Sequence, residues 1–135
     1  MKMTAQENAA ALRAQGYNCA QAVVGAFCEA YGLEKEKALR AASMLGGGLG
    51  GSGECCGAAL GMCMALGLAC GSAQADPEKK KAQNALVHQA MDIFRQRQGA
   101  TLCPELKRDK EGCDRIVSEA VKIAQDMLAQ QAKSV

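Results

Sequence analysis

Aromatic residues are scarce in this sequence, which has two Tyr, two Phe and no Trp in 135 residues. Hydrophobic residues nevertheless make up 49% of the chain, so its core must be built from Ala, Leu, Val, Ile, Met and Cys. This composition favours helices. The length suits a single domain over residues 1–135, large enough to bury about two-thirds of its unfolded surface.

No charge of one sign dominates the chain either. The 16 basic and 14 acidic residues give a net charge of +2, and they form neither a basic stripe nor a polybasic cluster. We therefore expect no nucleic-acid partner and no charged membrane anchor. The stretch MKMTAQENAAALRAQG lacks the unbroken apolar segment of an export signal, so we expect the protein to be cytoplasmic.

A long hydrophobic run is also missing. The most apolar segment, residues 55–71, falls short of the ~20 residues that span a bilayer, so we expect no membrane insertion. Gly57 and Gly61 give this segment a GxxxG pattern, in which small residues let neighbouring helices approach closely. We therefore predict a buried central helix here.

The two-residue alternation of half-buried strands does not persist in any long window, whereas apolar residues recur at helical spacing along nearly the whole chain. We predict an all-α fold, a single compact bundle of about six helices with a glycine-rich loop before the central helix. Asn18 and Asp76 are expected N-caps, and Pro77 suits a first helical turn. The predicted helices cover about residues 4–15, 18–32, 34–45, 54–70, 77–98 and 113–130.

The glycine-rich loop spans Gly46 to Gly53 and contains a GxGxxG match that begins at Gly48. A dinucleotide-binding fingerprint should follow a strand, whereas here a helix is predicted before it. A P-loop would need a Lys directly after the glycines, and none is present. We interpret the loop as a hinge that presents the cysteines after it.

Cysteine is abundant, with eight residues, but no CxxC pair occurs. This absence argues against thioredoxin-like motifs, zinc ribbons and the common ferredoxin spacings. In a reducing compartment, cysteines are more often metal ligands, catalytic thiols or buried hydrophobes than disulfide partners. A cysteine site in this protein must therefore be assembled from distant segments.

The cysteines divide into two sets by their place on the predicted helices. Cys28, Cys63 and Cys70 lie within helices or at their ends and, like Met62 and Met64, are interpreted as core residues. The others lie where helices are predicted to begin, with Cys103 next to Pro104 at a predicted single helical turn. The partial positive charge of a helix start favours thiolates. We expect these starts to converge on one site. The residues of this second set are Cys19, Cys55, Cys56, Cys103 and Cys113.

Four motifs, GYNCAQAV, CGAALG, LCPEL and GCDRIV, resemble the redox-active protein family that is named for its C_GCAxxG_C_C cysteine signature. The likeness extends over about residues 16–125 and implies a small helical protein with a cysteine-centred redox role. Gly57, Ala58 and Gly61 would complete the central motif, although Cys56 precedes Gly57 here, the reverse of the named order. By this resemblance the signature cysteines are Cys19, Cys56, Cys103 and Cys113.

The family is remotely similar to split-Soret cytochromes, which hold haem and an iron–sulfur centre. This likeness implies an iron–sulfur cluster, [2Fe–2S] or [4Fe–4S], bound by the four signature cysteines and used in electron transfer with an unknown redox partner. Gly53 at the end of the glycine-rich loop, and Gly57 after it, would bring backbone N–H groups to the cofactor. Covalent c-type haem is excluded because the sequence has no CxxCH.

Two alternatives stay open. In the first, the protein holds no metal, and a low-pKa Cys56 attacks an oxidant or a disulfide while Cys19, Cys55, Cys103 or Cys113 resolves the product. In the second, it is a structural helical dimerisation module with buried cysteines. We expect a homodimer, since helices of small residues can pack closely between chains. Cys55 has three possible roles here: a substitute ligand, a resolving thiol or a contact to a neighbouring helix.

Overall fold

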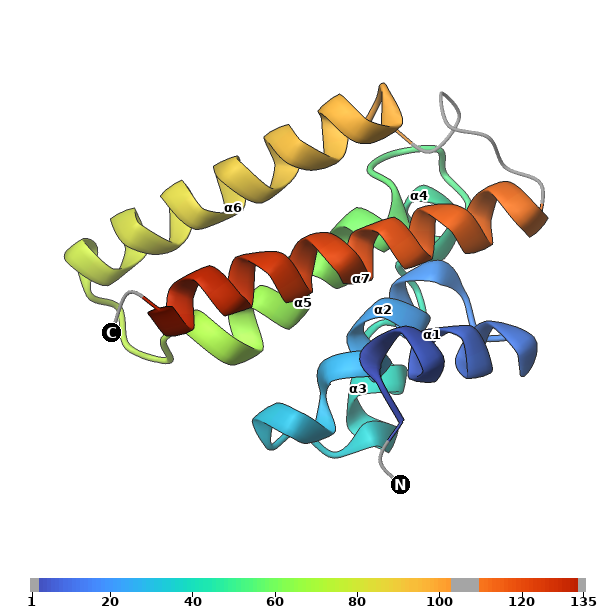
Figure 1. Ribbon diagram of the computed structural model, residues 1–135, viewed down its shortest axis with the longest axis horizontal. Helices are drawn as coiled ribbons and strands as arrows, with labels where there is room; N and C mark the ends of the chain where they lie inside the picture. The colour runs from blue at the N-terminus through green and yellow to red at the C-terminus, as the bar shows by residue number, and fades with distance from the viewer. Residues whose placement is uncertain (1–2, 103–109, 134–135) are drawn as a thin grey trace.

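Every regular element is helical in the part of the chain that a computed structural model describes, residues 3–102 and 110–133 (Figure 1). The prediction of an all-α fold is confirmed. None of the helices in these two ranges is both long enough and apolar enough to cross a bilayer. The elements are α1 (Ala5–Ala14), α2 (Cys19–Phe27), the 3-10 turn η1 (Glu29–Tyr31), α3 (Lys35–Ala41), α4 (Gly46–Leu49), α5 (Gly57–Cys70), α6 (Pro77–Gln98) and α7 (Lys110–Lys133).

Local sequence determines where the helices start. Asn18 caps α2 in a capping box with Gln21, because each side chain accepts a hydrogen bond from the backbone N–H of the other residue. Asp76 caps α6 through its side chain, and Pro77 follows as the first helical residue, where its missing N–H costs nothing. Both predicted caps, Asn18 and Asp76, are therefore confirmed.

Two predicted helix starts near the cysteines are wrong. The central helix begins at Gly57, three residues later than predicted, because the backbone of Cys55 instead forms an isolated antiparallel bridge with Leu102. The last helix begins at Lys110, so Cys113 is its fourth residue and not its first. Cys55 therefore lies outside any helix, and Cys113 lies at the end of the first turn of α7.

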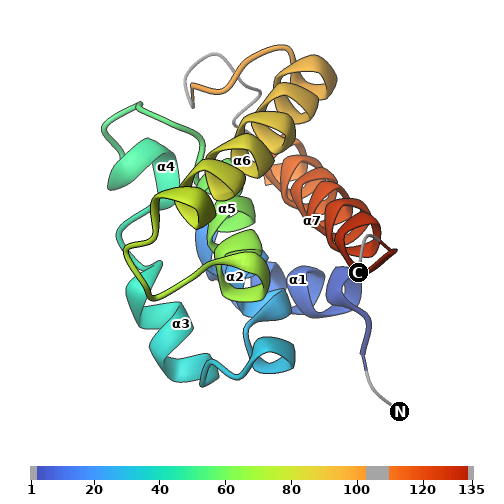
Figure 2. The same ribbon diagram turned by 90° about the vertical axis from the view of Figure 1, so that its left-hand side faces the viewer.

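The central helix of the fold is α5 (Figure 2). Its most extensive partner is α2, and α6 and α7 also pack against it. Gly61 makes the approach to α2 close, because a Cβ built on it would lie 2.8 Å from both the Ala20 carbonyl oxygen and Val23 Cβ. The GxxxG pattern thus marks a close helix contact, as predicted. The largest fully buried side chains include Phe94, Leu12, Met62, Leu66 and Ile123.

The glycine loop before α5 forms a compact left-handed turn. The five consecutive residues 47–51 all have positive φ, so α4 is not a regular right-handed helix. Glycine adopts this conformation without a steric penalty, whereas Leu49, at φ +70°, costs about 1 kcal/mol. The N–H of Gly53 donates to the carbonyl oxygen of Gly47 at 3.3 Å and helps to close the turn. The loop therefore holds a defined, hydrogen-bonded conformation.

Candidate functional site

Cys19 and Cys56, two of the predicted site residues, lie at the starts of α2 and α5, two helices that pack together. Cys19 is the first residue of α2, and Cys56 occupies the N-cap position of α5. A Cβ built on Gly57 would lie 2.5 Å from Cys19 Sγ, so the thiol rests on the backbone directly beside Cys56. Position 57 must therefore be glycine for this sulfur to fit. The contact between α2 and α5 thus places Cys19 against the residue that follows Cys56.

The backbone of Cys56 is hydrogen-bonded to the segment that precedes Cys103, another signature cysteine. Its N–H donates to the carbonyl oxygen of Thr101 at 2.8 Å, next to the bridge between Cys55 and Leu102. Leu102 is followed in the sequence by Cys103, which lies outside the described residues. These contacts hold the end of the segment after α6 against the start of α5.

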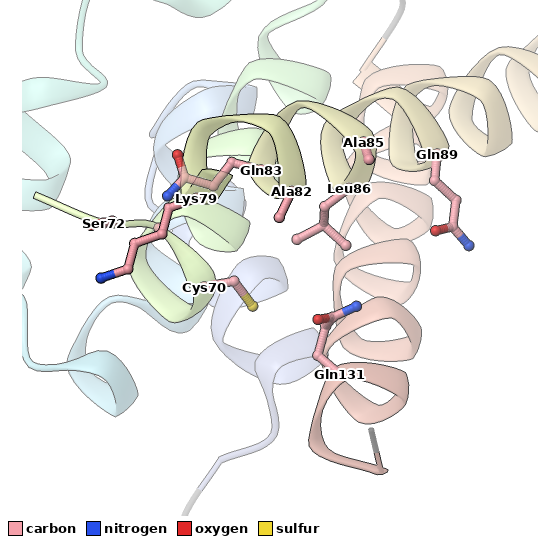
Figure 3. Close-up of a pocket in the computed structure, with 10 residues that line it drawn as sticks. Cys70, Ser72, Lys79, Ala82, Gln83, Ala85, Leu86, Gln89 and Gln131 are labelled. Atoms are coloured by element: carbon pink, nitrogen blue, oxygen red, sulfur yellow. The ribbon is translucent and has the colours of Figure 1, made fainter. Parts of the chain in front are cut away.

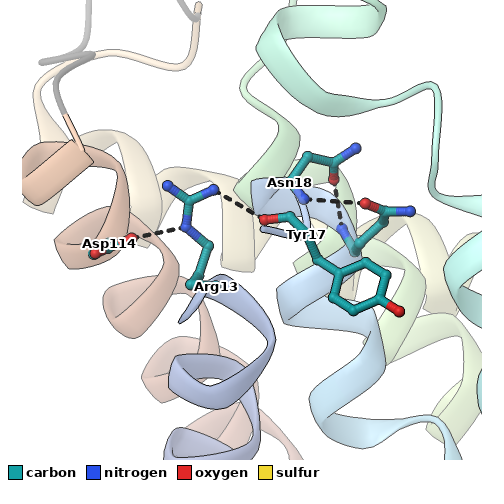
Figure 4. A network of polar contacts seen from close by, with 5 residues as sticks. Arg13, Tyr17, Asn18 and Asp114 are labelled. Atoms are coloured by element: carbon teal, nitrogen blue, oxygen red, sulfur yellow. Dashed lines mark hydrogen bonds and ion pairs between the residues drawn. The ribbon is translucent and has the colours of Figure 1, made fainter. Parts of the chain in front are cut away.

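A polar network joins the start of α7 to the residues before Cys19 (Figure 4). Arg13 Nε donates to Asp114 Oδ1 at 2.7 Å, and Arg13 Nη1 donates to the Tyr17 carbonyl oxygen at 3.1 Å. Because the ion pair is partly exposed, it contributes at most about 1 kcal/mol, and its main effect is positional. It places Cys113, which is half-buried and adjacent to Asp114, at the end of the molecule where α2 begins.

The glycine loop packs closely on both helix starts. A Cβ built on Gly46 would lie 2.7 Å from Asn18 Cβ, and one on Gly57 would lie 2.9 Å from the Leu45 carbonyl oxygen. Asn18 Nδ2 also donates to the Ser43 carbonyl oxygen at 3.1 Å. Small residues thus let the loop touch α2 and α5 beside the two cysteines. The N–H of Gly53, by contrast, is engaged inside the loop.

The described residues do not by themselves form a complete metal site. Within residues 3–102 and 110–133, no three His, Cys, Asp or Glu side chains gather closely enough to share an ion. Seven cysteines fall in these ranges, and none of these seven forms a disulfide. A four-cysteine centre therefore needs Cys103 in addition to Cys19, Cys56 and Cys113.

The remaining cysteines differ in their surroundings. Cys28 is fully buried, as predicted, and burial raises the pKa of its thiol. Cys63 and Cys70 are only partly buried, so their interpretation as core residues holds less well. Burial raises the pKa of Cys55, and burial together with the nearby Cys55 raises the pKa of Cys63 to about 11. Both thiols are therefore protonated at neutral pH.

We predict that ionisation of Cys63 lowers the stability of the protein as the pH rises from about 9 to about 11. The pKa of Cys63 is raised from 9.0 to about 11 in the folded protein, so the unfolded chain loses this proton first. Alkaline pH therefore lowers the free energy of unfolding, by about 1.4 kcal/mol at pH ~10 and by about 2.7 kcal/mol at most. Urea unfolding under reducing conditions, at pH ~8 and pH ~10, measures this loss.

Cys63→Ser supplies the control for this pH dependence, because serine is similar in size and does not titrate in this range. The difference in unfolding free energy between the two pH values should be smaller for the variant than for the unmodified protein. An equal decline in both proteins would show that Cys63 does not contribute.

One groove of the described surface lies away from Cys19 and Cys56. It has a volume of about 590 Å³ and runs between the C-terminal end of α5, the first half of α6 and the end of α7 (Figure 3). Cys70, Lys79, Leu86 and Gln131 are among the residues that line it. The groove is therefore separate from the junction of α2 and α5, where Cys19 lies against Gly57.

Sequence reasoning missed the ion pair between Arg13 and Asp114, since these residues are 101 positions apart and no local signal pairs them.

A profile of one protein family matches residues 17–127, which include Cys19, Cys56, Cys103 and Cys113. None of the curated proteins and none of the solved structures compared with the chain matches it. The resemblance inferred from the four motifs is thus confirmed, and the chain belongs to the family described as "Putative redox-active protein (C_GCAxxG_C_C)".

Proposed function

We propose that the protein transfers electrons through an iron–sulfur cluster held by Cys19, Cys56, Cys103 and Cys113. The observation that carries the proposal is the position of Cys19 Sγ on the backbone of Gly57, beside Cys56. Two signature thiols from separate helices are thereby placed at the starts of α2 and α5, where helix dipoles favour negatively charged groups.

The chemistry of this donor set fits an iron–sulfur cluster, because all four donors are thiols and such clusters are held by cysteine thiolates. When bound, the cluster would supply one-electron transfer. The chain's own contribution is positional: Gly57 leaves space for Cys19, and Arg13 holds the start of α7, which carries Cys113. The bridge to Leu102 fixes the segment that leads to Cys103.

A second candidate is a metal-free dithiol centre formed by Cys19 and Cys56. It is favoured by the position of Cys19 Sγ against Gly57, the residue after Cys56, since two thiols suffice for this chemistry. In that reaction one thiolate attacks a substrate disulfide and forms a mixed disulfide with half of the substrate, while the other half leaves as a thiol. The second protein thiol then attacks this mixed disulfide and releases the bound half as a thiol. One disulfide forms in the protein, the substrate disulfide is reduced to two thiols, and two electrons and two protons move to the substrate.

Anaerobic purification followed by absorption spectroscopy and by iron and sulfide analysis tests the cluster directly. We expect bound iron and sulfide in the unmodified protein, their loss in Cys56→Ser and their retention in Cys70→Ser, a partly buried cysteine away from the site. Far-UV circular dichroism should show folded helices in both variants.

A folded, colourless and metal-free protein would contradict the cluster proposal. Counting free thiols before and after mild oxidation, with mapping of the linked peptides, then tests the dithiol centre. A Cys19–Cys56 disulfide would support it. Thiols that never change would contradict both redox candidates and leave the structural dimerisation module.

A further inference from the structure

Two sulfur atoms outside the signature set meet between α5 and α6. Cys63 Sγ on α5 lies 3.9 Å from Met91 Sδ on α6, although the two residues are 28 positions apart in the sequence. Both side chains are half-buried and pack against the edge of the main core. The redox site proposed above uses neither of them.

The spacing of these sulfurs suits a shared ion. Metal–sulfur bonds of about 2.3 Å at a tetrahedral angle place neighbouring sulfurs within roughly 4 Å of each other. A thiolate and a thioether are both soft ligands, and this pair selects Cu(I) over harder cations. The helix pairing thus already holds two ligands at a distance that a metal ion would require.

Charge also favours a monovalent ion at this position. A thiolate with one Cu(I) is neutral, whereas a divalent ion on the same pair would leave a net positive charge among apolar side chains, which is costly. Both Cys63 and Met91 pack against the main hydrophobic core cluster, and burial is the main cause that raises the pKa of Cys63. A bound cation would replace the proton that Cys63 otherwise keeps.

Cys63 is the member of the pair that lines a cavity. A cavity of about 200 Å³ between α5 and α6 is lined by Cys63, Leu66, Cys70, Leu86 and Val87, among others. It shares Cys70 and Leu86 with the larger groove shown in Figure 3. Cys63 therefore lines a cavity that neighbours this groove.

We propose that Cys63 Sγ and Met91 Sδ form a binding site for a soft monovalent cation, Cu(I), at the junction of α5 and α6. On binding, the Cys63 thiol releases its proton to the solvent and a Cu–S bond forms, while Met91 donates a sulfur lone pair. No sulfur changes oxidation state. The site is independent of the signature cysteines and of whether they hold a cluster.

Methionine-methyl NMR tests the site in the full-length protein. The protein is labelled with [methyl-13C]methionine and titrated anaerobically with Ag(I), a diamagnetic probe, and then with Cu(I) kept reduced by ascorbate. The Met91 resonance is identified by its absence in Met91→Leu, a volume-conserving change. We expect this resonance to move on metal addition and to stay in place in Cys63→Ser.

Competition with a Cu(I) chelator provides the affinity. We expect Met91→Leu to weaken one Cu(I) site by at least about tenfold, which is about 1.4 kcal/mol. Met64→Leu is the matched control, because Met64 lies beside Cys63 in sequence but packs against the smaller second core cluster. That variant should keep the wild-type affinity.

The same titration in Cys56→Ser separates this site from the proposed redox centre. A Met91 shift that persists in this variant supports an independent site, even if the cluster proposal fails. A Met91 methyl that does not move at saturating metal, or that moves equally in Cys63→Ser, would overturn the proposal.

Discussion

Replacing Gly61 with alanine is expected to destabilise the protein by about 3 kcal/mol. The added Cβ would lie 2.8 Å from the Ala20 carbonyl oxygen and 2.8 Å from Val23 Cβ. The first of these is backbone of α2, so it can move away only if the two helices separate. Because α2 is the most extensive partner of α5, that separation would loosen the centre of the fold.

The same substitution at Gly67 is the matched control. Gly67 lies on the same helix, is exposed, and has nothing within 4 Å of a built Cβ. There alanine should stabilise the protein by about 1 kcal/mol through its higher helix propensity. Urea unfolding followed by far-UV circular dichroism measures both effects. If Gly61→Ala proved neutral or stabilising like the control, the close approach of α2 and α5 would be refuted.

Local chemistry explains which parts of the fold the sequence could predict. The bounds predicted for α6 match the structure because Asp76 and Pro77 mark its start, and Gly99, with φ +83°, marks its end. The GxxxG pattern likewise predicted close packing of the central helix, because it depends only on side-chain size. Both features are local, because they depend on the helix preferences of single residues and on the spacing of small residues within one helix.

Long-range pairing explains what the sequence could not predict. The late start of α5 depends on the bridge between Cys55 and Leu102, and nothing near Cys55 indicates that partner. In the same way, no spacing rule indicates that Cys19 would rest on Gly57 or that Cys63 would meet Met91. The motifs identified the signature cysteines, but only tertiary packing selects which sulfurs become neighbours.

Cys103 lies outside the described ranges, and its predicted role rests on the sequence motif. The cytoplasmic location and the homodimer also stay predictions. The contact between Cys19 and Gly57, in contrast, can be tested directly by mutation.

Gly57→Ala is expected to cost about 3 kcal/mol of stability, because its Cβ would lie 2.5 Å from Cys19 Sγ and 2.9 Å from the Leu45 carbonyl oxygen. If the sulfur causes part of this cost, removing it should relieve that part. Gly57→Ala should therefore cost less in a Cys19→Ala background, by a coupling free energy of about 1 kcal/mol. The contact with Leu45 persists, so the relief should be incomplete.

A double-mutant cycle, measured by urea unfolding under reducing conditions, gives this coupling. The parallel cycle with Cys70→Ala is the control, since Cys70 lies at the opposite end of α5 and should show no coupling with position 57. Equal costs of Gly57→Ala with and without Cys19 would mean that the thiol does not rest on this glycine. The cysteine pair would then have no structural basis, and both redox candidates would lose the observation that places Cys19 beside Cys56.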